Sequence, residues 1–362
     1  MSARHFMPRP RLGTLSRWSG AIALAVTLTV AGKPQDLQRM ADAVKAQAEG
    51  QRFMGSVLVA KGSNVVFETS VGLANVEWGI PDSATTKFRI GSLTKQFTAA
   101  AILLLQERGK LRVDDPVAKY IHDLPAPWQP VTLRQLLTHT SGIPDTTDLS
   151  KPDSREWERS GFTPAMLFDR MRSLPLDFEP GTNFKYSNTG YILLGWIVER
   201  ASGQSYREFL QENFFTPLGM AGSGYDLNSA ILPQRASGYR TGALGIRNAN
   251  YIDMRAPGGA GGLYSTTGDL LKWTRALFGG RVLRPDSLKA MTTPVRDHYG
   301  FGLQIASKNG RQRFAHGGGI DGFGSFLAFF PASGVTIVVL SNVEGPAAPQ
   351  LEEQLEKACF GD

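Results

Sequence analysis

The sequence predicts an α+β fold, in which an antiparallel sheet built from N-terminal and C-terminal strands is flanked by helices and carries an inserted, mostly helical lobe. The first observation is that runs with strand-like composition lie near both ends of the chain. The second is that apolar residues recur at helical spacing between these runs. Strands from the two ends would have to pair in one sheet, and a cleft between the sheet and the inserted lobe is the expected result.

The composition is that of a globular protein with a large core. The chain has 362 residues, 42% of them hydrophobic, which is enough for one large domain or two interlocked subdomains. Its formal charge is +7, but Arg4, Arg9, Arg11 and Arg17 lie close to the N-terminus, and without these four the charge falls to +3. No basic run with interleaved aromatic residues is present, so we expect no nucleic-acid partner.

Residues 1–31 have the layout of a secretory signal peptide. Arginines precede an apolar run at 21–30, and Thr29 and Ala31 supply small side chains at positions typical of a cleavage site. Because the run is short for a bilayer span, we expect cleavage, export to the periplasm or the medium, and no stable membrane span afterwards; a retained anchor is the alternative. The mature domain would cover residues 32–362. Cys359 is the only cysteine, so no internal disulfide is expected.

The sheet lobe is expected over residues 32–98 and 290–362. An amphipathic helix is predicted at 36–49, ending at Gly50, and a hairpin follows with strands at 56–60 and 64–67. Later strands are predicted at 301–306, 313–315, 324–330 and 335–340, with turns at Asn309-Gly310 and at 332–334. A last helix at 346–359 closes the chain.

The helical lobe is expected over residues 99–289. The spacing of apolar residues predicts helices at 133–137, 191–201, 206–214 and 269–278, the last of them preceded by the capping sequence Ser265-Thr266-Thr267. Stretches rich in Pro, Asp and Gly at 141–152 and 256–262 are predicted to be long loops. Loops of this length often shape the mouth of a substrate site.

A Ser-x-x-Lys sequence, Ser92 to Lys95, stands at the start of a long apolar helix that Gly109 ends. Residues three apart on a helix share a face, so the Lys95 amine can reach back to the Ser92 hydroxyl. A serine becomes a good nucleophile when a neighbour takes its proton, and a lysine can do so if burial keeps it partly neutral. The same four residues also fit an ordinary N-cap serine followed by a solvated lysine.

Two further motifs add to this pair. Tyr186-Ser187-Asn188 precedes a predicted helix, and His316-Gly317-Gly318-Gly319 follows a predicted strand. In this order, the three motifs resemble those of the serine β-lactamase and penicillin-binding-protein superfamily, most closely its class C and esterase-like branch. Supporting stretches are Leu136-Leu137-Thr138-His139-Thr140-Ser141-Gly142, Pro180-Gly181 and Gly261-Gly262-Leu263-Tyr264-Ser265-Thr266. The resemblance extends from about residue 36 to 340 and implies a β-lactamase/DD-peptidase-like fold.

The resemblance implies catalytic roles for four residues. Ser92 would attack a carbonyl and form an acyl-enzyme. Lys95 and Tyr186 would share the proton transfers, and either of them is a candidate for the general base. Asn188 would donate its side-chain amide to the substrate carbonyl and contact Lys95; a turn residue that caps the following helix is the alternative interpretation of Asn188.

The resemblance also implies an oxyanion hole formed by two backbone N–H groups, those of Ser92 and Gly319. Substrate must approach the main chain closely at such a site. The glycines at Gly317, Gly318 and Gly319 suit this approach, although a flexible loop is the alternative interpretation of the glycine run. We therefore include all three with Asn188 and His316 as candidate substrate-binding residues.

His316 departs from the pattern of many relatives, which have lysine at this place to hold a substrate carboxylate. Histidine is neutral or only partly charged near pH 7, so recognition of the penicillin carboxylate is weakened. We therefore favour an esterase or peptidase-like serine hydrolase. The alternatives are a class C-like β-lactamase, a penicillin-binding protein or sensor that deacylates slowly, and a pseudoenzyme that serves as an interaction module.

The substrate is expected to be a small-molecule ester, amide or β-lactam, and no cofactor or metal is expected. The five histidines are scattered along the chain, and no metalloprotease, Walker or Gly-x-Ser-x-Gly sequence is present. A Glu-x-x-Leu-Asn segment of the class A β-lactamases is also missing between Asn188 and His316, so deacylation would depend on Tyr186 and Lys95. His139 is interpreted as a structural, hydrogen-bonded residue.

Overall fold

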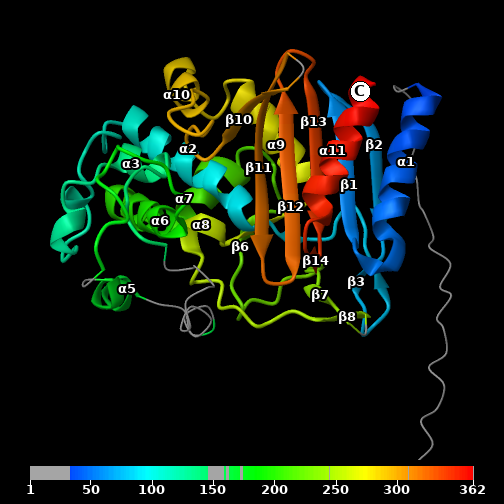
Figure 1. The fold of residues 1–362 in the computed structure, drawn as a ribbon, viewed down its shortest axis with the longest axis horizontal. Coiled ribbons are helices and arrows are strands. Elements are labelled where there is room, and N and C mark those ends of the chain that lie inside the picture. The colour runs from blue at the N-terminus through cyan, green and yellow to red at the C-terminus, as the bar shows by residue number, and fades with distance from the viewer. Residues whose placement is uncertain are drawn as a thin grey trace, which may run out of the picture.

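A six-stranded antiparallel sheet with the strand order β10-β11-β12-β13-β1-β2 forms the largest layer of the computed structural model (Figure 1). The structure describes residues 33–145, 159, 163–171, 174–243, 245–308 and 310–361; the predicted signal peptide lies outside them. The strands are β1 (Gly55–Lys61), β2 (Asn64–Val71), β10 (Gln304–Lys308), β11 (Arg311–Ile320), β12 (Phe323–Phe330) and β13 (Val335–Ser341). Strand β1 pairs with β13, for example Val57 with Val339. This pairing of the two chain ends confirms the predicted fold class.

Each face of the sheet packs against a different set of helices. Successive side chains of a strand point to opposite faces, so Val57 and Val59 pack with α1 (Pro34–Ala48) and α11 (Ala347–Phe360) on one face. Leu58 and Ala60 belong to the core shared with the helical lobe on the other face. Figure 1 shows α1 and α11 in front of the sheet and α9 behind it. Burying one valine or leucine in such a layer stabilises the fold by about 1.5–3 kcal/mol.

The inserted lobe is built around α2 (Thr94–Glu107), in which residues 94–103 are all buried. A helix that is buried on every side needs an apolar sequence all round, and this explains its Ala- and Leu-rich composition. The other helices of the chain's middle part are α3 (Leu133–Leu137), α5 (Pro164–Met171), α6 (Asn188–Ser202), α7 (Tyr206–Leu210), α8 (Gly258–Gly261), α9 (Thr267–Phe278) and α10 (Pro285–Met291). No helix among the described residues has the length and hydrophobicity that a membrane span needs.

Three small sheets in the structure were not predicted from the sequence. They join β3 (Leu73–Asn75) to β4 (Ile80–Pro81), β5 (Phe88–Arg89) to β9 (Leu263–Ser265) and β6 (Gly224–Tyr225), and β14 (Val343–Glu344) to β7 (Tyr239–Gly242) and β8 (Gly245–Asn248). Strands of two to four residues are too short to show a periodic pattern, and most of these pair over long sequence distances. Several strands therefore run through the region predicted to be mostly helical.

Several predicted boundaries were wrong. The strand predicted at 313–315 is β11, which continues through the glycine run, because Gly317 pairs with Phe326 and Gly319 with Gly324 of β12. Because glycine has a low strand propensity, the sequence pattern did not predict that the strand extends through these residues. The strand predicted from residue 301 begins at Gln304, and the loop predicted at 256–262 contains the short helix α8. The helix predicted at 206–214 changes after Leu210 into a π-helix, Gln211–Phe215.

Short 3-10 helices complete the described elements: Glu49–Gln51, Gly91–Leu93, Val117–Lys119 and Ala126–Trp128. The predicted turn at Asn309-Gly310 connects β10 with β11; Asn309 itself lies outside the described residues, and Gly310 has φ 73°. The predicted loop at 141–152 is described only as far as residue 145.

Candidate active site

Ser92 lies in the 3-10 helix Gly91–Leu93, directly before α2 begins at Thr94. The sequence predicted that the α-helix begins with the Ser-x-x-Lys residues, and this boundary was wrong for Ser92. The N-cap of α2 is Leu93 and makes no side-chain capping bond, so Ser92 is not an N-cap serine. Its side chain is half-buried and thus remains accessible.

The strands around Ser92 hold this turn in place. The Ile90 N–H donates to the Leu263 carbonyl at 3.0 Å, next to the pairing of β5 with β9. Arg89 Nε donates to Asp226 Oδ2 and Arg235 Nη1 donates to Asp226 Oδ1, both at 2.7 Å. The Asp226 side chain is only 1% exposed, and removing one partner of a buried ion pair typically costs about 3–5 kcal/mol. A buried ion network therefore anchors the strand that leads to Ser92.

Lys95 is completely buried and donates three hydrogen bonds. Its Nζ lies 3.0 Å from Ser92 Oγ, 2.7 Å from Asn188 Oδ1 and 2.9 Å from the Ala260 carbonyl oxygen of α8. Three acceptors match the three hydrogens of an ammonium group. Burial nevertheless lowers the pKa of Lys95 to about 7, against the opposing effect of the Asp145 carboxylate. Lys95 is thus partly neutral near neutral pH, and a neutral amine can accept the Ser92 proton.

Tyr186 lies next to both Lys95 and Ser92, with its ring centroid 4.8 Å from Lys95 Nζ. Burial raises the pKa of Tyr186 well above its usual value of 10, while a hydrogen bond with the Ser92 side chain lowers it to a smaller extent. The phenol is therefore protonated near neutral pH. Of the two candidate bases, Lys95 is the one whose pKa lies in the physiological range.

Asn188 connects Lys95 to an acidic residue that sequence reasoning missed. Its Oδ1 accepts from Lys95, and its Nδ2 donates to Asp145 Oδ2 at 3.1 Å. Asn188 is the first residue of α6, whose N-cap is Ser187 with no side-chain capping bond, so the alternative interpretation of Asn188 as a cap was wrong. Asp145 stands three residues after Gly142 in a predicted loop, and no local pattern distinguishes it from other loop acids.

His316 is buried on β11, and both of its ring nitrogens are engaged within the protein. Nδ1 lies 2.6 Å from the Gly317 carbonyl oxygen, and Nε2 lies 2.8 Å from the Tyr299 hydroxyl. A carbonyl can only accept, so Nδ1 carries the proton and Nε2 accepts from Tyr299. Burial, together with the charge of Lys95, lowers the pKa of His316 to about 3. The ring is therefore neutral, and Tyr299 is a second residue that sequence reasoning missed.

The glycines of β11 bring this strand against the Ser92 turn. A Cβ on Gly318 would lie 2.2 Å from the Ile90 carbonyl oxygen and 3.1 Å from the Ser92 nitrogen. A Cβ on Gly91, whose φ is 48°, would lie 3.0 Å from the Gly319 nitrogen. The backbone nitrogens of Ser92 and Gly319, the two expected oxyanion donors, are thus on adjoining segments. Because the glycine run belongs to β11, the alternative of a flexible loop was wrong.

His139 lies behind Tyr186 and supports it. The Ser187 N–H donates to His139 Nδ1 at 3.1 Å, and the imidazole packs on the Tyr186 ring with 4.2 Å between ring centroids. Burial, together with the charge of Lys95, lowers the pKa of His139 well below its usual value. The bond to Ser187 agrees with the predicted structural, hydrogen-bonded role.

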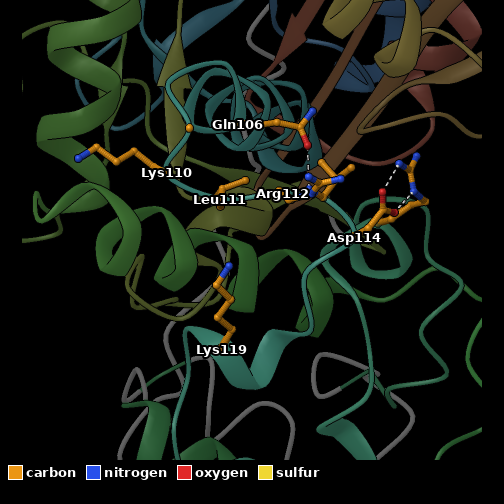
Figure 2. Close-up of a pocket in the computed structure, with 9 residues that line it drawn as sticks. Gln106, Lys110, Leu111, Arg112, Asp114 and Lys119 are labelled. Carbon is orange, nitrogen blue, oxygen red and sulfur yellow. Dashed lines mark hydrogen bonds and ion pairs between the residues drawn. The ribbon is translucent and has the colours of Figure 1, made fainter.

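A separate pocket of about 620 Å³ lies beyond the C-terminal end of α2, where residues 109–114 meet Lys119 and Arg134 (Figure 2). Its acidic residue is paired, since Arg134 Nε donates to Asp114 Oδ1 at 2.6 Å. None of the candidate site residues lines this pocket. No group of three or more potential metal ligands occurs in the described part of the chain.

The fold and the site together define a class. The features of a serine hydrolase with the β-lactamase fold are all present: a sheet formed by both chain ends, an inserted helical lobe, and a buried lysine in contact with a serine. The Beta-lactamase family model matches residues 38–359, and the chain belongs to the β-lactamase family.

Individual relatives agree with this assignment. Penicillin-binding protein 4* of Bacillus subtilis (strain 168) is 32% identical over 319 residues, which cover 82% of this chain and 69% of the relative. The penicillin-binding protein from Bacillus halodurans has a TM-score of 0.77 at 30% identity and covers 91% of this chain and 100% of its own. A D-stereospecific amidohydrolase from Streptomyces sp. also has a TM-score of 0.77, at 25% identity, with coverage of 90% and 98%.

Proposed function

We propose that this protein cleaves an ester or amide bond of a small molecule through an acyl intermediate on Ser92. The observation that carries the proposal is the contact of 3.0 Å between Ser92 Oγ and a fully buried lysine amine, Lys95 Nζ. Burial brings the pKa of this amine to about 7, so a useful fraction is neutral at physiological pH. A serine with a partly neutral amine in contact is an activated nucleophile.

In the proposed mechanism, neutral Lys95 takes the proton of Ser92 as the oxygen attacks the substrate carbonyl. The N–H groups of Ser92 and Gly319 stabilise the negative charge that develops on the carbonyl oxygen. Protonated Tyr186 passes a proton to the leaving group and is reprotonated from Lys95. Water then attacks the acyl-enzyme with the same residues acting in reverse, which releases the acid and restores Ser92.

An ester or amide is favoured over a β-lactam by the state of His316. The penicillin carboxylate needs a cation or a strong donor, whereas His316 is neutral and already bonded to Gly317 and Tyr299. The amidohydrolase similarity is compatible with this preference. The similarity to penicillin-binding proteins supports the second candidate, a protein that is acylated by penicillin and deacylates slowly; a class C-like β-lactamase is the third.

The test combines intact-protein mass spectrometry with substrate turnover. Wild type, Ser92→Ala and the control Ser63→Ala, which changes an exposed serine in the β1–β2 turn, are each incubated with p-nitrophenyl butyrate, D-phenylalanine amide and benzylpenicillin. We expect turnover of the ester or amide that falls about 10³-fold or more in Ser92→Ala and is unchanged in Ser63→Ala.

The incubation with benzylpenicillin distinguishes the three candidate functions. A lasting adduct on Ser92 without ester or amide turnover would favour the slow penicillin-binding protein, and rapid loss of penicillin would favour the β-lactamase. Ester or amide turnover that survives in Ser92→Ala would contradict the proposed nucleophile.

We also propose that the protein is exported and acts in the periplasm or the medium, on the strength of the sequence pattern in residues 1–31. N-terminal sequencing of protein recovered from the native host's extracytoplasmic fraction tests this proposal. A mature N-terminus near residue 32 is expected, and an intact Met1 in the cytoplasmic fraction would contradict it.

A further inference from the structure

Asp145, Asn188 and Lys95 form a line of hydrogen-bonded groups that ends at Ser92. The contacts are 3.1 Å from Asn188 Nδ2 to Asp145 Oδ2, 2.7 Å from Lys95 Nζ to Asn188 Oδ1, and 3.0 Å from Lys95 Nζ to Ser92 Oγ. We propose that Asp145 is a positioning residue for acyl transfer, which acts through Asn188 to hold Lys95 against Ser92 and to stabilise its ammonium form. This inference rests on the proposed function.

The first step of the argument concerns the orientation of the Asn188 amide. Its oxygen and nitrogen ends have nearly the same shape, so packing alone does not choose between the two orientations. A carboxylate can only accept a hydrogen bond, and the ammonium of Lys95 can only donate. In the flipped orientation, the Asn188 oxygen would face Asp145 and its NH₂ group would face Lys95, which are two repulsive contacts. Asp145 therefore selects the orientation in which Asn188 Oδ1 accepts from Lys95.

The second step concerns the charges around Lys95. The neighbours that interact with it are the rings of Tyr186 and Tyr191, at 4.8 and 5.5 Å from Nζ, the histidines His139 and His316, and the carboxylate of Asp145. Burial keeps both phenols protonated and both imidazoles neutral at neutral pH.

Of these described neighbours, Asp145 is thus the one that supplies negative charge. It opposes the effect of desolvation, which is the larger of the two, and so raises the pH at which Lys95 changes from acid to base. Asp145 also raises the pKa of Tyr186, so it helps to keep the two proton carriers in different protonation states.

Two substitutions separate the charge of Asp145 from its hydrogen bond. Asp145→Asn keeps an oxygen that can accept from Asn188 and removes the charge, whereas Asp145→Leu removes both. The control is Asp114→Asn, which removes a carboxylate that is 61% exposed and paired with Arg134 near the separate pocket. Thermal unfolding checks that each variant is folded.

The titration of Lys95 is followed by NMR of protein labelled with ¹³C at lysine Cε, with the signal assigned by its loss in Lys95→Arg. In Asp145→Asn we expect the midpoint to move down by about one pH unit, because the substitution removes a unit negative charge that is separated from Lys95 only by the Asn188 amide. The rate at which a fluorophosphonate labels Ser92 should fall at acid pH, and the midpoint of this fall should move down together with the NMR midpoint of Lys95. In Asp114→Asn, neither midpoint should move. In Asp145→Leu we expect a similar shift and, in addition, a labelling rate about tenfold lower at the pH plateau.

An unchanged Lys95 midpoint in Asp145→Asn would overturn the charge effect, and an unchanged plateau rate in Asp145→Leu would overturn the positioning role. A failure of the proposed function looks different. Fluorophosphonate labelling would then persist in Ser92→Ala, while the NMR midpoint would still report on Asp145, because that measurement needs no catalysis.

Discussion

Gly318→Ala tests the close approach of β11 to the Ser92 turn. The added methyl group would lie 2.2 Å from the Ile90 carbonyl oxygen and 2.3 Å from Ser325 Oγ. Ordinary contact begins at 3.4 Å, so the two segments would have to separate by about 1.2 Å, and the Ile90 oxygen is main chain that cannot rotate away. Ser325 Oγ also donates to this oxygen at 2.8 Å, and the methyl group would disturb that bond. Overpacking of this kind costs about 1–3 kcal/mol of unfolding free energy.

The same displacement should reduce activity, because the proposed oxyanion donors lie on the two segments that are forced apart. A misplacement of about 1 Å can cost about 10²-fold in rate. Urea unfolding followed by tryptophan fluorescence measures the stability, and kcat for an ester or the rate of fluorophosphonate labelling measures the site.

The matched control is Gly319→Ala. No atom lies within 4 Å of a Cβ at Gly319, and alanine keeps the backbone N–H. We expect the unfolding free energy of this variant to stay within about 0.5 kcal/mol of wild type, so it is the control for the stability measurement. Equal unfolding free energies of Gly318→Ala and Gly319→Ala would refute the reasoning, because the two substitutions differ in the protein contacts of the new methyl group.

Two further predictions concern buried polar groups. Tyr299→Phe removes the hydroxyl that donates to His316 Nε2, so we expect a loss of about 1 kcal/mol in unfolding free energy and a lower kcat; unchanged stability would contradict the bond. Burial raises the pKa of Asp82 to about 8, so the native state binds the extra proton between about pH 4 and 8 and wild-type stability falls as pH rises through this interval. Asp82→Asn removes this effect. Urea unfolding should show the two proteins about equally stable at pH 4.5 and the variant more stable than wild type by about 4 kcal/mol at pH 8. A difference that does not grow with pH would contradict this prediction.

Local patterns were enough to predict much of the fold. The strands β1, β12 and β13 and the helices α6 and α9 lie close to their predicted places, because apolar periodicity and turn residues are encoded within each segment. The extension of β11 through Gly317–Gly319 was missed, since glycine signals a loop by its own propensity and is drawn into the strand by pairing with β12. The two-residue strand β5 exists through its pairing with β9, far along the chain.

In the site, too, some features follow from local sequence and others from contacts between distant segments. The sequence alone determined the candidate site residues, because Ser92, Lys95, Tyr186, Asn188 and the stretch from His316 to Gly319 form ordered motifs. The tertiary structure decided their chemical state. Lys95 donates a hydrogen bond to the carbonyl of Ala260, 165 residues away, and burial excludes water from its amine. The structure also brought in Asp145 and Tyr299, which no motif distinguishes. Desolvation, tautomer and pKa depend on contacts between distant segments, whereas a motif records only the order of residue types along the chain.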